Sequence, residues 1–149
     1  MALLLAVVLD CKPVELLPFT AQGHTKRGLK VEVTKKGVTV RVGQSVLWST
    51  EGHAFAVMIS EEDQWVALKG PYPTGSITIA PATVGAKPVT VDPLAHLTPD
   101  ERQRVPVTSC GVSWFKGWRN APRVLLLEVE QGEAPAVMLQ VKPDGTVSR

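Results

Sequence analysis

The stretch Leu29–Ser49, LKVEVTKKGVTVRVGQSVLWS, decides the fold class of this chain. Apolar and polar residues alternate on both sides of Lys35-Lys36-Gly37, and a period of two is typical of strands that bury one face. Gly37 completes the first turn, and Gly43-Gln44 leads into a third apolar run. The stretch therefore predicts a β-meander.

Similar short runs, bounded by glycine, proline or acidic residues, continue through the rest of the chain. They predict further strands over residues 2–9, 53–59, 64–68, 76–80, 88–91, 123–129 and 136–141.

Helix is expected only between residues 98 and 118. Thr98-Pro99-Asp100-Glu101 has the order of a capping box with proline at the first helical position, and Pro106 ends that helix. A second short helix is expected from Cys110, where Trp114 and Trp118 would share one face. We predict a mainly β (α+β) fold: one antiparallel sheet of six or more strands with one or two short helices between residues 98 and 118, in a single domain 1–149.

Composition indicates an ordinary globular protein. Apolar residues make up 44% of the 149 and charged residues 20%, which argues against disorder. The net charge of +2 demands no polyanionic partner. Two cysteines, Cys11 and Cys110, are too few for a disulfide framework, so free thiols are expected, with a single bridge between them as the alternative.

The apolar run Ala2–Leu9 bears on localisation. It is too short to span a bilayer, no basic residue precedes it, and Asp10 follows it where a lipobox needs a small residue. We expect a buried strand here, no transmembrane segment, no secretion signal, and a place in the cytoplasm or within an assembly.

His53 and Cys110 are the candidate catalytic pair. His53 lies in an alternating run that predicts a strand, and Cys110 opens the second expected helix. A thiol at a helix N-terminus beside an imidazole can form a thiolate–imidazolium couple.

The order of these segments resembles the permuted papain-like group, in which histidine precedes cysteine: lecithin:retinol acyltransferase-like proteins, NlpC/P60 relatives and the picornaviral H-box/NC proteins. Gly43-Gln44 stands where the family has Gly-Asp, His53 where it has the base, and Ser109-Cys110 where it has Asn-Cys. The resemblance implies Cys110 as nucleophile, His53 as base and an acyl or lipid-type substrate. Ala67 stands on the return strand where the family has a polar residue that orients the histidine, so a degenerate member is also expected.

Other interpretations of the same two residues stay open. A histidine on an apolar strand and a free cysteine are often packed residues without chemistry. The strands before His53 also resemble a cupredoxin, although no histidine follows Cys110 to complete a copper site. His24 and His96 are isolated, so no zinc site, no other metal site and no cofactor is expected.

Two binding surfaces are alternatives to catalysis. Aromatic and basic residues of the kind that bind single-stranded nucleic acid gather over 114–123, although packed tryptophans beside solvated cations are favoured: Trp114, Lys116, Trp118, Arg119 and Arg123. The second alternative is a virion or assembly module that oligomerises, or binds a protein partner, through Ala2–Leu9 and the hairpin Arg123–Val141. The acidic turn Glu61-Glu62-Asp63 is expected to be a solvated tip.

Overall fold

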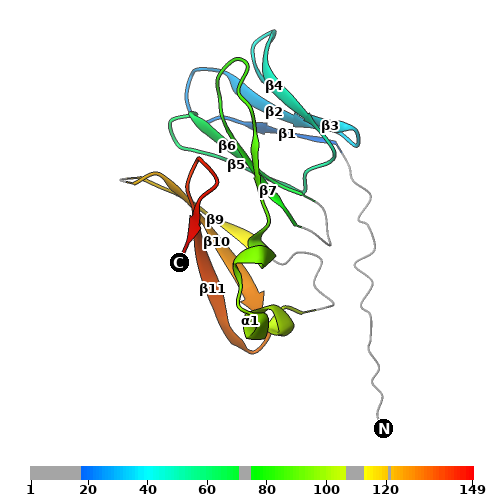
Figure 1. Ribbon diagram of the computed structural model, residues 1–149. Coiled ribbons are helices and arrows are strands. Elements are labelled where there is room, and N and C mark those ends of the chain that lie inside the picture. The colour runs from blue at the N-terminus through cyan, green and yellow to red at the C-terminus, as the bar shows by residue number, and fades with distance from the viewer. Residues whose placement is uncertain (1–17, 71–74, 107–112, 121) are drawn as a thin grey trace.

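The protein folds into three antiparallel sheets of four strands (Figure 1). The computed structural model describes residues 18–70, 75–106, 113–120 and 122–149. The first sheet holds β1 (Phe19–Gln22), β2 (Leu29–Val33), β3 (Gly37–Val42) and β4 (Ser45–Glu51) in that order. The middle sheet holds β5 (Ala56–Ile59), β6 (Trp65–Lys69), β7 (Ile77–Pro81) and β8 (Val89–Val91). The last sheet has the order β12-β11-β10-β9, with β9 (Ser113–Arg119), β10 (Val124–Gln131), β11 (Ala134–Val141) and β12 (Val147–Ser148).

The first sheet is the predicted meander, extended by β1. Val31 on β2 pairs with Val40 on β3, and both are fully buried because alternate residues of each strand face the core. Leu47 and Trp48 are buried although they are consecutive, since the pairing of β3 with β4 shifts by one residue at this point.

The middle sheet is buried on both faces. Val66 and Leu68 pack into a first core shared with the first sheet, whereas Ala67, between them on β6, packs into a second core shared with the last sheet. Ile77 and Ile79 of β7 also enter the second core. The middle sheet thus lies between the other two, and this shared layer supports a β-rich single domain (Figure 1).

The prediction of one sheet with six or more strands is wrong, although the mainly β, antiparallel class is confirmed. Alternation of apolar and polar residues identifies strands but does not say which strands pair. The chain leaves the first sheet after β4 and the middle sheet after β8, and each time the next strand starts a new sheet. Two layers of core result instead of one.

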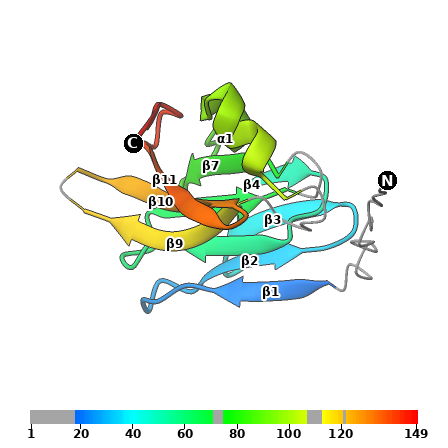
Figure 2. The same cartoon turned by 90° about the horizontal axis from the view of Figure 1, so that it is seen from below.

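One predicted helix is confirmed, and the other is wrong over its described part, residues 113–118. The helix α1 (Pro99–Arg104) begins with the expected capping box, because the Thr98 hydroxyl accepts from the Glu101 N–H and the Glu101 carboxylate accepts from the Thr98 N–H. A short 3₁₀ helix, η1 (Pro93–His96), precedes it. Residues 113–119 form strand β9 instead of a helix, and β9 lies beside β10 at the edge of the last sheet (Figure 2). Residues four apart share a face in a strand as well as in a helix, so the tryptophan spacing did not distinguish the two.

The two apolar terminal segments have different outcomes. Ala2–Leu9 lies outside the described residues, so its predicted strand is not addressed. Val124, Leu125 and Leu127 of β10 are buried, the last two within the second core. This block is therefore accounted for by internal packing. Within the described ranges no helix is long and apolar enough to cross a bilayer.

Candidate functional site

His53 lies in the connection between β4 and β5, because β5 begins only at Ala56. Its Nδ1 is 3.0 Å from the carbonyl oxygen of Thr34, and its ring meets the ring of Phe55 edge to face at 5.5 Å between centroids. A carbonyl only accepts hydrogen bonds, so Nδ1 carries the hydrogen and Nε2 keeps a lone pair in the neutral ring. The Thr34 carbonyl therefore orients His53, a role that a polar residue on the return strand has in the family that the sequence resembles.

Cys110, the predicted nucleophile, lies outside the described residues, as does Cys11. The helix expected to run from Cys110 through Trp118 is excluded over its described part, because β9 begins at Ser113.

The predicted aromatic and basic surface is divided between two faces of β9. Trp118 points inward, where its indole N–H donates to the Met58 carbonyl at 3.1 Å and its ring lies 6.5 Å from that of Trp65. Trp114 is 47% exposed. The pairing of β9 with β10 shifts beside Gly117, which has a φ of 131°, and this irregularity changes which residues face the core.

The three basic residues of that surface already have partners. Lys116 is 2.9 Å from Glu128, Arg123 forms an ion pair with Glu62, and Arg119 donates to the Gln140 side chain at 2.9 Å. A phosphate backbone would have to displace these partners. The arrangement does not favour the nucleic-acid interpretation.

Lys69, the last residue of β6, forms a cluster that the sequence analysis missed. The side chain is buried, and its Nζ lies 4.3 Å from the centroid of the Trp114 ring. The Trp114 indole N–H in turn donates to Glu130 at 3.1 Å. Burial lowers the pKa of Lys69, and the charge of Glu130 offsets part of that effect.

Asp63 is fully buried just before β6, so the expectation of a solvated acidic tip is wrong for this residue. Its carboxylate accepts from the backbone N–H groups of His24 at 2.8 Å and Thr25 at 2.9 Å, and from the Thr25 hydroxyl. Burial alone would raise the pKa of Asp63, but the hydrogen bonds from Thr25 and His24 outweigh it and hold the pKa below its ordinary value. The β1–β2 loop is thereby fixed to the middle sheet.

Arg27 completes this junction and borders a pocket. Its Nη1 donates to the Asp63 carbonyl at 2.7 Å and its Nη2 donates to the Ala82 carbonyl. The pocket has a volume of about 280 Å³ and is lined by Arg27, Gln64, Trp65, Pro81, Ala82 and Thr83. We call it the Arg27 pocket. No local sequence signal marks this pocket, because three separate segments of the chain form it.

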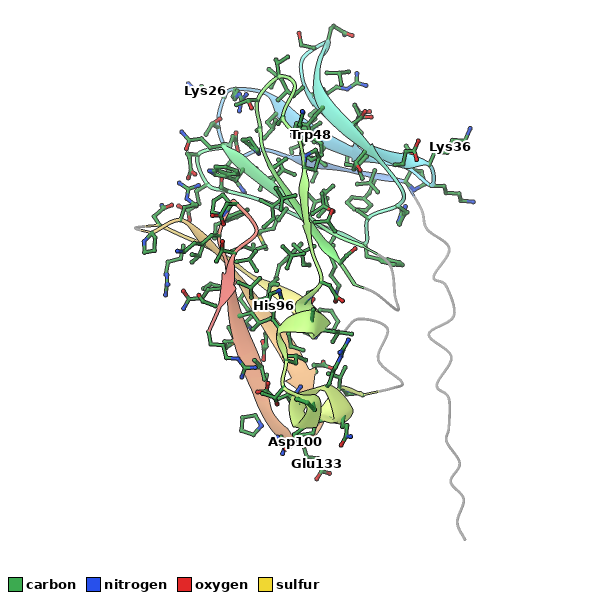
Figure 3. The ribbon with its side chains drawn as sticks, viewed as in Figure 1. Lys26, Lys36, Trp48, His96, Asp100 and Glu133 are labelled. Carbon is green, nitrogen blue, oxygen red and sulfur yellow. The ribbon has the colours of Figure 1, made fainter. Side chains whose placement is uncertain are left out.

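The Arg27 pocket and His53 are separate sites. Arg27 follows Lys26 in the β1–β2 loop, whereas Thr34, the partner of His53, lies just before Lys36 in the β2–β3 turn. Consecutive turns of an antiparallel sheet lie at opposite ends, and Figure 3 shows Lys26 and Lys36 at opposite ends of the first sheet.

Over the described parts of the chain, no three His, Cys, Asp or Glu side chains are grouped to hold a metal ion. No family model, curated protein or solved structure matches this sequence.

Proposed function

We propose that this protein is a non-catalytic binding module that holds a small ligand in the Arg27 pocket. The observation that carries this proposal is the rigid construction of the pocket. Arg27 bridges the carbonyls of Asp63 and Ala82, so the β1–β2 loop is tied to the β5–β6 turn and to the residue that follows β7 before any ligand arrives.

Rigid walls lower the entropic cost of binding, because the protein need not become ordered when the ligand binds. The Ala82 N–H also donates to the Gln64 carbonyl at 2.8 Å, which fixes the two lining segments against each other. The volume of about 280 Å³ lies near the lower end of the range for small-molecule sites, about 300–1,000 Å³. The ligand is accordingly small, about the size of a single substituted ring.

The test is a fragment screen on the full chain, followed by amide chemical shifts in ¹H–¹⁵N spectra. A true ligand produces saturable shifts at Gln64, Ala82 and Thr83. Thr83→Trp fills the pocket and abolishes these shifts. Val84→Trp is the matched control, because Val84 is 78% exposed beside Thr83 and does not line the pocket. A screen without saturable shifts, or an equal loss in both variants, contradicts the proposal.

A second candidate is thiol chemistry by Cys110 and His53 on an acyl substrate. It is favoured by one observation, the bond from His53 Nδ1 to the Thr34 carbonyl, which leaves Nε2 to accept a proton. In this reaction Nε2 takes the thiol proton, the sulfur bonds to the acyl carbon, and the leaving group departs with a proton from the imidazolium.

Site-resolved alkylation tests this candidate, with Cys11 as an internal reference. At about pH 7, iodoacetamide labels an activated Cys110 at least about tenfold faster than Cys11, and His53→Asn removes the difference. Equal labelling of the two thiols, with a pH dependence typical of an ordinary thiol near about 8.5, would contradict it.

A further inference from the structure

Resting on the proposed function, we infer that the ligand of the Arg27 pocket is a small monocarboxylate with a compact apolar body. The pocket combines one fixed guanidinium with apolar lining from Trp65, Pro81 and Ala82. Such a lining favours a ligand that carries a single negative charge at one end.

The guanidinium of Arg27 is anchored without a carboxylate partner. Among the described residues, no carboxylate oxygen lies within 4.0 Å of its nitrogens, whereas three other arginines form ion pairs: Arg41 with Glu32, Arg123 with Glu62 and Arg149 with Glu101. The nearby Asp63 carboxylate accepts from His24 and Thr25, and Arg27 donates to the Asp63 backbone instead. The guanidinium of Arg27 therefore donates hydrogen bonds to neutral carbonyls and forms no ion pair with a described carboxylate.

Arg27 retains donors for a ligand. A guanidinium has five N–H groups in a planar fork, and the bonds to Asp63 and Ala82 use one on Nη1 and one on Nη2. The remaining N–H groups match the two oxygens of a carboxylate, and a charge-assisted bond of this kind is about twice as strong as a neutral one.

The lining also distinguishes a carboxylate from a phosphate. A phosphate monoester carries about −1.5 to −2 charges near neutral pH, and Arg27 is the only charged side chain among the lining residues. The uncharged polar groups, on Gln64 and Thr83, supply hydrogen bonds but no second positive charge. A second negative charge would therefore lie against apolar surface.

Three ligands that share a phenyl ring test the inference: benzoate, benzamide and phenyl phosphate. We expect benzoate to bind the unmodified protein at least about tenfold more tightly than neutral benzamide, as one charge-assisted hydrogen bond predicts. Phenyl phosphate is expected to bind more weakly than benzoate. Added salt should weaken benzoate binding and leave benzamide binding unchanged.

Arg27→Lys keeps the positive charge but loses the planar fork, so benzoate affinity is expected to fall about tenfold while benzamide affinity is unchanged. Arg119→Lys is the matched control, because Arg119 lies on β9 and does not line the pocket. If Arg27→Lys does not fold, the three-ligand comparison and the salt series on the unmodified protein decide the matter.

The outcomes separate the two proposals. Equal binding of benzoate and benzamide overturns the carboxylate inference and leaves the binding module standing. Tighter binding of phenyl phosphate overturns the assignment to a monocarboxylate. Failure of all three ligands overturns the inference, and the proposed function falls as well only when the wider fragment screen also finds no pocket ligand.

Discussion

A buried ionisable side chain lies near each end of strand β6, and the surroundings of the two side chains have opposite effects on their charged forms. Asp63, two residues before the strand, receives three hydrogen bonds from His24 and Thr25. Lys69, its last residue, faces the Trp114 ring and the charge of Glu130. The pKa lies below its ordinary value in both cases.

The same direction has opposite meanings for an acid and a base. A lowered pKa at Asp63 means that the folded protein stabilises the carboxylate, whereas a lowered pKa at Lys69 means that it destabilises the ammonium ion. Hydrogen-bond donors offset the cost of burial at one end, and an aromatic ring offsets it only in part at the other. We expect the Asp63 junction to stabilise the fold and the charge on Lys69 to cost stability.

The largest expected effect follows removal of the Asp63 carboxylate. Asp63→Ala leaves three donors of the β1–β2 loop without an acceptor and places alanine at a φ of 61°. The free energy of unfolding should fall by about 3–4 kcal/mol. Asp63→Asn is the control, because asparagine keeps an acceptor and tolerates positive φ, and it should cost about 1–2 kcal/mol. Urea unfolding measures both, and changes below about 0.5 kcal/mol would contradict the central role of this junction.

A methyl group at Gly23 should disturb the same junction from the other side. A Cβ at this position would lie 2.6 Å from Asp63 Oδ2, and the carboxylate is held by bonds that resist its displacement. Gly23→Ala is expected to cost about 1–3 kcal/mol. In an Asp63→Ala background the clash is absent, so the cost should shrink. A double-mutant cycle measures the coupling, and additive effects would show that the close approach has no energetic consequence.

Acid unfolding should report the charge of Asp63. Because the folded-state pKa lies below the ordinary value of 3.8, the ionised group stabilises the folded protein above that value. This contribution is lost as pH falls from about 4 through the lowered folded-state pKa, at about 1.4 kcal/mol for each unit of lowering. In Asp63→Asn, this part of the fall in the free energy of unfolding at acid pH should be absent. If the difference in unfolding free energy between wild type and variant stays constant across the acid range, the hydrogen-bonded carboxylate does not contribute as proposed.

Local patterns in the sequence predicted local structure well. The structure confirms the alternation in β2 and β3, the turn between them and the capping box at Thr98. Each of these features depends only on residues that are close together in the sequence. The division into three sheets depends on contacts between distant strands, which the alternation does not encode.

The candidate sites show the same limit more strongly. Asp63 follows two acidic residues and looks solvated in the sequence, but a loop about forty residues earlier closes over it, with a separation of 39 positions for the bond to His24. The group that orients His53 is a backbone carbonyl, which every residue has. Neither feature can be identified from residue type, since each arises when the chain brings distant segments together.

The smallest expected effect comes from the other end of β6, and it has the opposite sign. Lys69→Met keeps a long apolar side chain beside Trp114 and removes the buried charge, so we expect a gain of about 1 kcal/mol near pH 7. Since the pKa of Lys69 is lower in the folded protein than in the unfolded chain, the cost of its charge is fully present below the folded-state pKa and is relieved as pH rises toward about 10.4. The advantage of the variant should therefore shrink in urea titrations above neutral pH.

Lys116→Met provides the matched control, because Lys116 lies exposed on β9 in an ion pair with Glu128 and its removal should change stability by less than about 0.5 kcal/mol. A loss of more than about 1 kcal/mol on Lys69→Met would mean that the contact with Trp114 and the charge of Glu130 outweigh the cost of burial. In that case both ends of β6 would stabilise the fold through their charges, and the contrast between the ends would lie only in whether hydrogen bonds or an aromatic ring hold the charge.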